Sequence, residues 1–170
     1  MLSLKTQRHR LEVQGYLGLS DSDVREVAPW LRFTPWMNAT ILAIGTILGS
    51  YRILGAEAIL MALGAVLPLH PFDWVYNVAI RRFTRTRPLP PSGQQRRFVF
   101  GIMCWWLLPT AYFFYLGKHT VPPNPKYFSW AFVSGCVLIA LPLLLAMSDL
   151  CAVSELLNWL SRKRDKSPKA

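Results

Sequence analysis

The sequence predicts an all-α protein, an integral membrane four-helix bundle with short interfacial helices, and three observations support this. The 170 residues are 52% hydrophobic and 13% aromatic, yet the formal net charge is +10. Most of the apolar residues gather in a few long runs, and most of the charged residues lie between or outside those runs. Apolar runs of this length, bordered by arginine, indicate helices that cross a lipid bilayer.

The first segment, residues 1–35, is predicted to be a cytoplasmic N-terminal arm. Charges are spread through it, and it lacks the continuous apolar stretch of a secretory signal. Asp23 and Glu26 have the spacing of a capping box, in which two residues satisfy the first free N–H groups of a helix. We therefore expect a short helix near residues 23–28.

The first two predicted spans share one apolar stretch of 34 residues, 36–69. A single helix of that length would measure roughly 50 Å at ~1.5 Å per residue, which exceeds a hydrocarbon core of ~30 Å. A break near residues 49–52 resolves the conflict. It predicts two short spans, 36–51 and 53–69, joined by a tight outer turn.

An interfacial helix is expected to follow over residues 71–82, and a loop rich in proline and arginine over residues 83–97. Pro71 suits the first position of a helix, and Asp73 lies in the first turn, where the helix dipole favours an anion. We expect this helix to lie in the inner interface on one apolar stripe. The stripe consists of Phe72, Val75 and Ala79, with Arg82 continuing it.

The third and fourth predicted spans are residues 98–117 and 128–148. With the first two they form a transmembrane domain over residues 36–161, and residues 162–170 form a basic cytoplasmic tail. Pro109 predicts a kink in the third span because proline removes a backbone hydrogen bond. The pattern after the fourth span is amphipathic, so we expect its helix to continue out of the bilayer.

The distribution of lysine and arginine predicts the orientation. In this topology 16 of the 19 basic residues lie in the arm, the central loop and the tail. Only Arg52, Lys118 and Lys126 fall on the opposite side. Because basic loops stay in the cytoplasm, we expect both termini to be cytoplasmic in a bacterial inner membrane, with an even number of spans.

The central basic segment is the main candidate for binding. Six arginines without an acidic neighbour suit anionic lipid head groups or an acidic face of a partner protein, although they could also serve only to fix the topology. These residues are Arg81, Arg82, Arg85, Arg87, Arg96 and Arg97. We do not expect nucleic acid as a partner, because little sequence remains to build a soluble phosphate-binding scaffold.

His70, at the inner end of the second span, has two interpretations. A neutral imidazole there could ligate a haem iron or a chlorophyll magnesium. Alternatively, His70 caps the helix that Pro71 begins. No second histidine lies within a span, which argues against a bis-histidine haem. The sequence requires no cofactor, and a pigment or quinone contact stays open.

The small-residue pairs are expected to serve helix packing. Gly45 and Gly49 in the first span, and Ala131 and Gly135 in the fourth, have the four-residue spacing that lets helices approach closely.

Three cysteines, Cys104, Cys136 and Cys151, show no C-x-x-C spacing and are expected to be free thiols. Cys151 is the candidate for a redox thiol.

Two acidic residues lie in or at the edge of predicted spans. Glu57 is about one turn inside the second span, and Asp149 is at the inner end of the fourth. Ionisable groups at membrane depth are candidates for function. The simpler interpretation is pairing, of Glu57 with Arg52 and of Asp149 with the basic loop.

Two sequence blocks carry a resemblance to a known family. Residues 70–77 (HPFDWVYN), and residues 88–91 (PLPP) leading to residues 96–98 (RRF), resemble a family of small bacterial four-helix integral membrane proteins, distantly similar to the DoxX group. Some relatives sit beside thiol or sulfur chemistry, and relatives often carry a cysteine in the last helix, which Cys151 could match. The paired cysteine of thiol exchange is missing here.

These observations lead to one main functional hypothesis and two alternatives. We expect a non-catalytic accessory or scaffolding subunit of a larger bacterial membrane complex, of the respiratory or photosynthetic type. The small size, the packing faces and the basic loop favour it, and no phosphate loop, metal spacing or nucleophile motif is present. The alternatives are a membrane thiol or quinone redox component and a small transporter.

Overall fold

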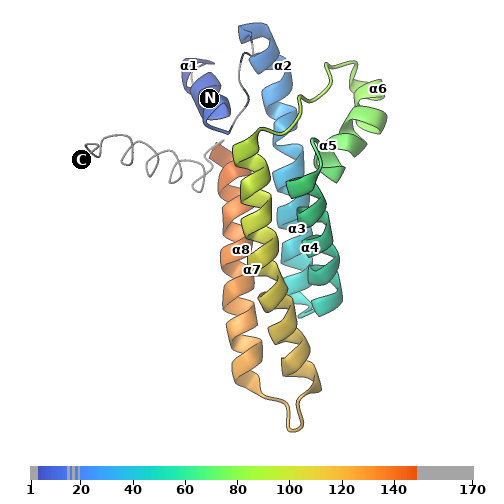
Figure 1. The fold of residues 1–170 in the computed structure, drawn as a ribbon, viewed down its shortest axis with the longest axis vertical. Helices are drawn as coiled ribbons and strands as arrows, with labels where there is room; N and C mark the ends of the chain where they lie inside the picture. The colour runs from blue at the N-terminus through green and yellow to red at the C-terminus, as the bar shows by residue number, and fades with distance from the viewer. Residues whose placement is uncertain (1–3, 15, 17, 19, 149–170) are drawn as a thin grey trace, which may run out of the picture.

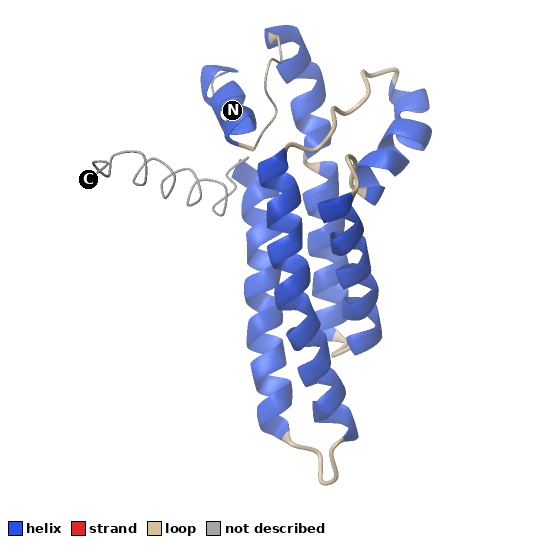
Figure 2. Cartoon of the chain, viewed as in Figure 1, coloured by secondary structure: helices blue, strands red, loops and turns tan. Residues whose placement is uncertain are grey.

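The chain is all-helical in the part that the structure describes (Figures 1 and 2). This computed structural model describes residues 4–14, 16, 18 and 20–148. The elements in chain order are α1 (Leu4–Val13), α2 (Asp21–Leu31), α3 (Phe33–Ile47), α4 (Tyr51–Val66), α5 (Pro71–Val75), the π-helix η1 (Tyr76–Ile80), α6 (Arg81–Thr84), α7 (Gln94–His119) and α8 (Pro125–Ser148). The all-α part of the predicted fold class is confirmed.

Four helices, α3, α4, α7 and α8, lie side by side as two antiparallel hairpins (Figure 1). Helix α4 packs along α7, α3 packs along α8, and each hairpin also packs within itself. Apolar side chains from all four helices fill the interior. The most deeply buried of them are Leu42, Leu54, Met61, Leu107, Phe114 and Leu138.

The turn predicted near residues 49–52 is found at residues 48–50. Gly49 has a φ of +54°, in the left-handed region that residues with a side chain disfavour. The Ser50 N–H donates to the carbonyl of Gly45 over 2.8 Å and closes the end of α3. The Ser50 hydroxyl then accepts the N–H of Ile53 over 3.4 Å and caps α4.

The longer hairpin consists of α7 and α8 and extends beyond the α3–α4 turn (Figure 1). Helix α7 begins at Gln94, before the predicted span, and continues through Pro109. Helix α8 continues through Pro142. The predicted continuation of the last helix beyond Ser148 and the basic tail lie outside the described residues.

The predicted N-terminal arm contains α1 and α2, and the next helix already begins at Phe33. Helix α2 is longer than the predicted helix because a different pair forms the capping box. The Ser20 hydroxyl accepts the Asp23 N–H over 3.2 Å, and the Asp23 carboxylate accepts the Ser20 N–H over 3.1 Å. The predicted pairing of Asp23 with Glu26 as the capping box is therefore wrong.

A second, smaller core lies at the end of the bundle that carries α1 and α2 (Figure 1). Apolar side chains of α1, α2, the segment between them, η1 and the loop before α7 meet there. They are Leu11, Tyr16, Val24, Val27, Leu31, Tyr76 and Leu89. The N-terminal helices are therefore packed onto the bundle.

The chain bends sharply after α4, by 79° between α4 and the helical segment Pro71–Thr84. This segment contains η1, and a π-turn holds one extra residue, which moves the later side chains around the helix axis. The interfacial apolar stripe stays a prediction, because a face that contacts lipid is exposed in the protein alone. Asp73 and Tyr76 are buried, whereas Val75 and Ala79 are exposed.

Two described helices, α7 and α8, are long and apolar enough to cross a membrane. Helix α4 together with the bent segment after it could form a third span. Alone, α3 has 15 residues and α4 has 16, fewer than the ~20 of a typical span. The described residues thus show two to three candidate spans, fewer than the four predicted.

Candidate functional site

A polar cluster is buried where the N-terminal helices meet the bundle, and an ion pair forms its centre. The side chains of Asp73 in α5 and Arg96 in α7 are 0% and 5% exposed. Arg96 Nη1 lies 3.0 Å from Asp73 Oδ2, and Arg96 Nη2 donates to Asp73 Oδ1 over 3.4 Å. The guanidinium therefore lies close to both carboxylate oxygens, but only Oδ1 accepts a hydrogen bond from it, and Oδ2 has no hydrogen-bond partner among the described residues.

Two further side chains form hydrogen bonds with this pair. Thr34 of α3 donates to Asp73 Oδ1 over 2.5 Å, and Arg96 Nη1 donates to the hydroxyl of Tyr16. The guanidinium carbon also lies 5.4 Å from the centre of the Phe100 ring. Removing two charges from water is costly and is offset only when their hydrogen-bonding groups are satisfied. The cluster therefore joins α3, α5, α7 and the segment before α2.

His70 lies at the edge of the cluster and begins α5. Its Nδ1 accepts the N–H of Phe72 over 3.3 Å, so the helix-capping interpretation is confirmed. The ring is fully buried, with its centre 4.6 Å from that of Phe100. A Cβ on Gly64 would come within 2.2 Å of His70 Cδ2. His70 Nε2 has no hydrogen-bond partner among the residues that the structure describes, so the pigment-ligand interpretation stays a prediction.

Burial and neighbouring charges shift the protonation of the cluster. Burial lowers the pKa of His70 to about 4, the positive charge of Arg96 acts in the same direction, and Asp73 opposes both. Burial raises the pKa of Tyr16, although Arg96 opposes it. At neutral pH the cluster thus holds a charged arginine beside a neutral histidine and tyrosine.

The cluster brings together the two sequence blocks that carried the family resemblance. His70 and Asp73 belong to residues 70–77, and Arg96 follows residues 88–91. The sequence predicts Asp73 in a helix turn without a partner, and it gives no indication of Tyr16 or Thr34.

A usable signal for Arg96 was present in the sequence. Arg96, Phe100, Met103 and Leu107 follow one another at helical spacing, and the last three lie on the buried face of α7. Arg96 therefore continues an apolar stripe. A charged residue at such a position becomes buried and needs a partner of opposite charge. The expectation that its side chain would be exposed to lipid or partner is wrong.

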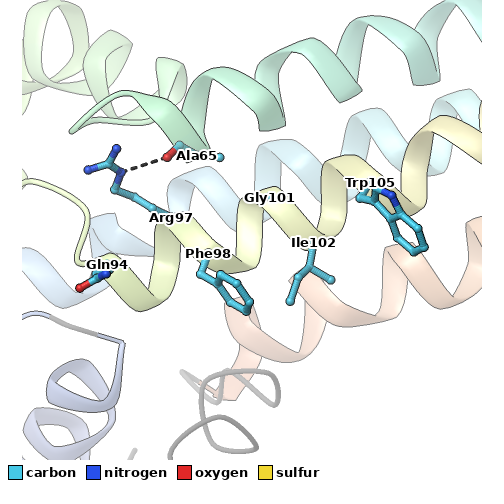
Figure 3. A pocket seen from close by; sticks show the side chains of 7 residues that line it. All are labelled: Ala65, Gln94, Arg97, Phe98, Gly101, Ile102 and Trp105. Atoms are coloured by element: carbon cyan, nitrogen blue, oxygen red, sulfur yellow. Dashed lines mark hydrogen bonds between the residues drawn. The ribbon is translucent and has the colours of Figure 1, made fainter.

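Arg97 also bonds within the chain. It donates to the carbonyl of Ala65 over 3.0 Å, as Figure 3 shows, and to that of Val66 over 2.5 Å. These groups end α4, where unpaired carbonyls attract cations. Beyond Arg97, a hollow of about 710 Å³ runs along α7 past Phe98 and Trp105 (Figure 3).

The other four arginines of the basic segment are all exposed, and one of them forms ion pairs with α2. Arg87 forms ion pairs with Asp23 and, over 3.5 Å, with Glu26. The other three line one concavity of about 480 Å³ on η1 and α6. They are Arg81, Arg82 and Arg85.

The small residues expected to serve packing lie at close helix contacts, with one exception. A Cβ on Gly45 would come within 2.6 Å of a side chain of α4, and one on Gly135 within 2.5 Å of a side chain of α3. Ala131 is fully buried. Gly49 lies in the α3–α4 turn rather than on a helix face.

The cysteines do not form a site in the described part of the chain. Cys104 is half-buried, Cys136 is exposed, and both are free. Cys151 lies outside the described residues, so the redox alternative stays a prediction. No group of three or more His, Cys, Asp or Glu side chains between residues 20 and 148, or in the described parts before them, is placed to hold a metal ion.

The fold and this cluster together define an all-helical protein with two to three helices that could cross a membrane and a buried arginine–aspartate joint at one end of its bundle. The chain belongs to the DUF4395 family, a domain of unknown function that matches residues 28–162. No curated protein and no solved structure gives a significant match.

Proposed function

We propose that this protein is a multi-pass protein of the bacterial inner membrane with four crossing helices and cytoplasmic termini. We further propose that it is a non-catalytic accessory subunit of a larger membrane complex, of the respiratory or photosynthetic type. The observation that carries this role is an aromatic groove on the outer face of α7 and α8.

Membrane residence is supported by what α7 and α8 expose. Trp105 and Trp130 are 78% and 70% exposed, and further apolar side chains accompany them along both helices. Continuous apolar surface of this kind indicates contact with lipid or with another protein. The exposed apolar residues include Leu108, Tyr112, Val133, Val137 and Leu144.

The orientation is supported by the arrangement of the hairpins. The α3–α4 turn and the α7–α8 connection lie at one end of the bundle, and α1 and α2 lie at the other (Figure 1). The exposed arginines of α6 are also on the side of α1 and α2 (Figure 1). Basic residues near membrane helices favour the cytoplasm, so this end is assigned to the cytoplasm.

The groove has a volume of about 590 Å³ and is lined by α7 and α8 alone. Three of its polar groups are already paired, because Thr110 and Ser134 share a hydrogen bond of 2.7 Å and Trp106 Nε1 donates to Ser134 over 2.9 Å. The remaining lining is apolar and mainly aromatic: Trp106, Pro109, Phe113, Tyr127, Trp130, Val133 and Val137.

We assign the groove to an apolar transmembrane helix of another subunit. Tryptophans that anchor a protein in lipid lie at the membrane surface, whereas Trp106 is near the middle of α7. Aromatic side chains are enriched at the centres of protein interfaces, where they supply large contact areas. A ridge of aliphatic side chains on a partner helix would fill the space.

Replacing Trp130 by alanine is expected to release the partner subunit. In mild detergent the wild-type protein should co-purify with a partner at fixed stoichiometry. Loss of an interface tryptophan of this kind costs about 2 kcal/mol, or about thirtyfold in affinity. The matched control is Trp105→Ala, which removes a similarly exposed tryptophan outside the groove and should retain the partner. A wild-type protein that is strictly monomeric would refute the accessory role.

Anionic lipid is the second proposed partner, at Arg81, Arg82 and Arg85. The same helical segment exposes Trp74 and Phe83, as expected of a helix at a membrane surface. Each arginine near an anionic surface contributes about 1 kcal/mol, or about fivefold in affinity.

Changing these three arginines to glutamine should therefore reduce the phosphatidylglycerol that the protein retains in native mass spectrometry. The control changes Arg52, Lys118 and Lys126 to glutamine, which alters the net charge equally at the opposite end. Equal lipid loss from both variants would contradict a specific site.

A further inference from the structure

A line of buried polar side chains continues from the Asp73–Arg96 pair into the bundle. Thr34, Asn38 and Thr46 are four and eight residues apart in α3, so they lie on one helix face. Each of the three is at most 2% exposed. Thr34 bonds to Asp73, but Asn38 Oδ1 and Thr46 Oγ1 have no hydrogen-bond partner.

Glu57 of α4 lies beside this line. Asn38 Nδ2 is 3.9 Å from Met61 Sδ, and a Cβ on Gly45 would come within 2.6 Å of Leu54. These two contacts fix the register of the antiparallel helices α3 and α4. Glu57 falls between Leu54 and Met61, and therefore faces the stretch of α3 between Asn38 and Gly45.

The Glu57 carboxyl group is isolated from every described charge. It is 0% exposed, and neither oxygen has a hydrogen-bond partner. The predicted pairing with Arg52 is wrong, because Arg52 is exposed, with its guanidinium 5.8 Å from the centre of the Tyr51 ring. The charged or basic side chains of the helices around Glu57 lie in first or last turns: Arg52, Arg96, Arg97, Lys118, His119 and Lys126. The other ionisable groups there are Cys104, Cys136 and the tyrosines.

An ionised carboxylate without a partner in an apolar interior costs many kcal/mol, so a group in this position holds a proton. A protonated carboxyl has one O–H donor and retains acceptor capacity. The unpaired oxygens of Asn38 and Thr46 are acceptors. Interior water commonly bridges polar groups that lack a partner.

We propose that Glu57 is a proton-binding site in the bundle core and that its proton exchanges with the Asp73–Arg96 end through water held by Asn38 and Thr34. Thr34 and Asn38, the two members between Glu57 and Asp73, are one helical turn apart, ~6 Å, a gap that one or two waters can bridge. In release, the O–H bond of Glu57 breaks as one forms on the adjacent water, and the excess proton moves toward Thr34.

The direction of exchange follows from the packing at the other end of the line. Beyond Thr46, the space beside Gly49 is closed by the rings of Phe128 and Phe114, which lie 2.7 Å and 3.5 Å from where a Cβ would be. The end at Asp73 is polar instead. The proton site does not depend on the accessory role, because all the residues of the line belong to this chain.

The first experiment tests the proton on Glu57. Dicyclohexylcarbodiimide in the membrane reacts with protonated carboxyl groups in apolar surroundings. The carboxyl O–H adds across the reagent, and the product rearranges to an N-acylurea that retains all atoms of both molecules. Mass spectrometry of the full-length protein at neutral pH should find one adduct per chain, mapped to Glu57 and absent from Glu57→Gln. An unlabelled Glu57 in the wild-type protein would overturn the proposal without any variant.

The second experiment tests the route. Infrared spectroscopy should show a carboxylic-acid C=O band in the wild-type protein that is missing from Glu57→Gln and shifts in D2O. Asn38→Leu should slow that shift at least tenfold. The matched control is Thr40→Val, an exposed site on the same helix whose hydroxyl bonds only to the carbonyl of Trp36. Equal rates in Asn38→Leu and Thr40→Val would overturn the route.

Discussion

Replacing Arg96 by methionine is expected to destabilise the protein by about 3–5 kcal/mol. The change preserves much of the side-chain length but leaves the fully buried Asp73 without its counter-ion, and breaking one partner of a buried pair has a cost of this size. It also removes the donor to Tyr16. Unfolding in detergent at increasing dodecyl sulfate, followed by circular dichroism, measures the loss.

The same experiment contains its control, because the cost comes from the unpaired charge and not from the loss of arginine itself. Adding Asp73→Leu to Arg96→Met removes both charges, and the double variant should regain most of the lost stability. Tyr16→Phe removes only one hydrogen bond and should cost about 1 kcal/mol. A single Arg96→Met variant within 0.5 kcal/mol, roughly the error of additivity, would show that the pair is not the joint described above.

Lowering the pH from about 7 to about 5 is expected to remove about 2 kcal/mol of stability through His70 alone. The unfolded imidazole binds a proton below about pH 6.5, whereas burial and Arg96 lower the pKa in the folded protein to about 4. Between these values the unfolded state holds more protons, so stability is fully present above about pH 6.5 and is lost as the pH falls toward 4.

His70→Asn tests this dependence, because its amide oxygen can still cap α5 by accepting the N–H of Phe72. The asparagine cannot be protonated, so the stability difference between pH 7 and pH 5 should shrink by about 2 kcal/mol while the other titrating groups contribute equally to both proteins. Identical pH dependence in the two proteins would contradict the buried, neutral state of His70.

The long apolar helices could be predicted because hydrophobicity is a property of the local sequence. The exact start of α7 could not be predicted. Gly93 offers no side-chain cap, and the polar composition of residues 94–97 is that of a loop. The π-helix η1 after the bend could not be predicted either. The π-turn of η1 changes the helical spacing, and the sequence contains no evident cue for it.

The partners of buried charges were the least predictable feature. Asp73 and Arg96 are 23 positions apart, and Arg96 and Tyr16 are 80 apart, so their contacts exist only once the helices have packed. Proximity in sequence was also misleading. Arg52 and Glu57 are close neighbours in α4, yet one side chain is exposed and the other is buried in the bundle. Helical spacing decides which residues share a face, and five positions do not place two residues together.

The unequal length of the two hairpins has a consequence for the surrounding lipid. At ~1.5 Å per residue, α3 with 15 residues is about 22 Å long and α7 with 26 residues about 39 Å. A bilayer that meets both flanks must become thinner beside the short hairpin, and such mismatch carries a cost for every ångström. The molecule should therefore behave as a wedge that prefers short-chain lipids on one flank, and it should tilt or cluster when the acyl chains are long.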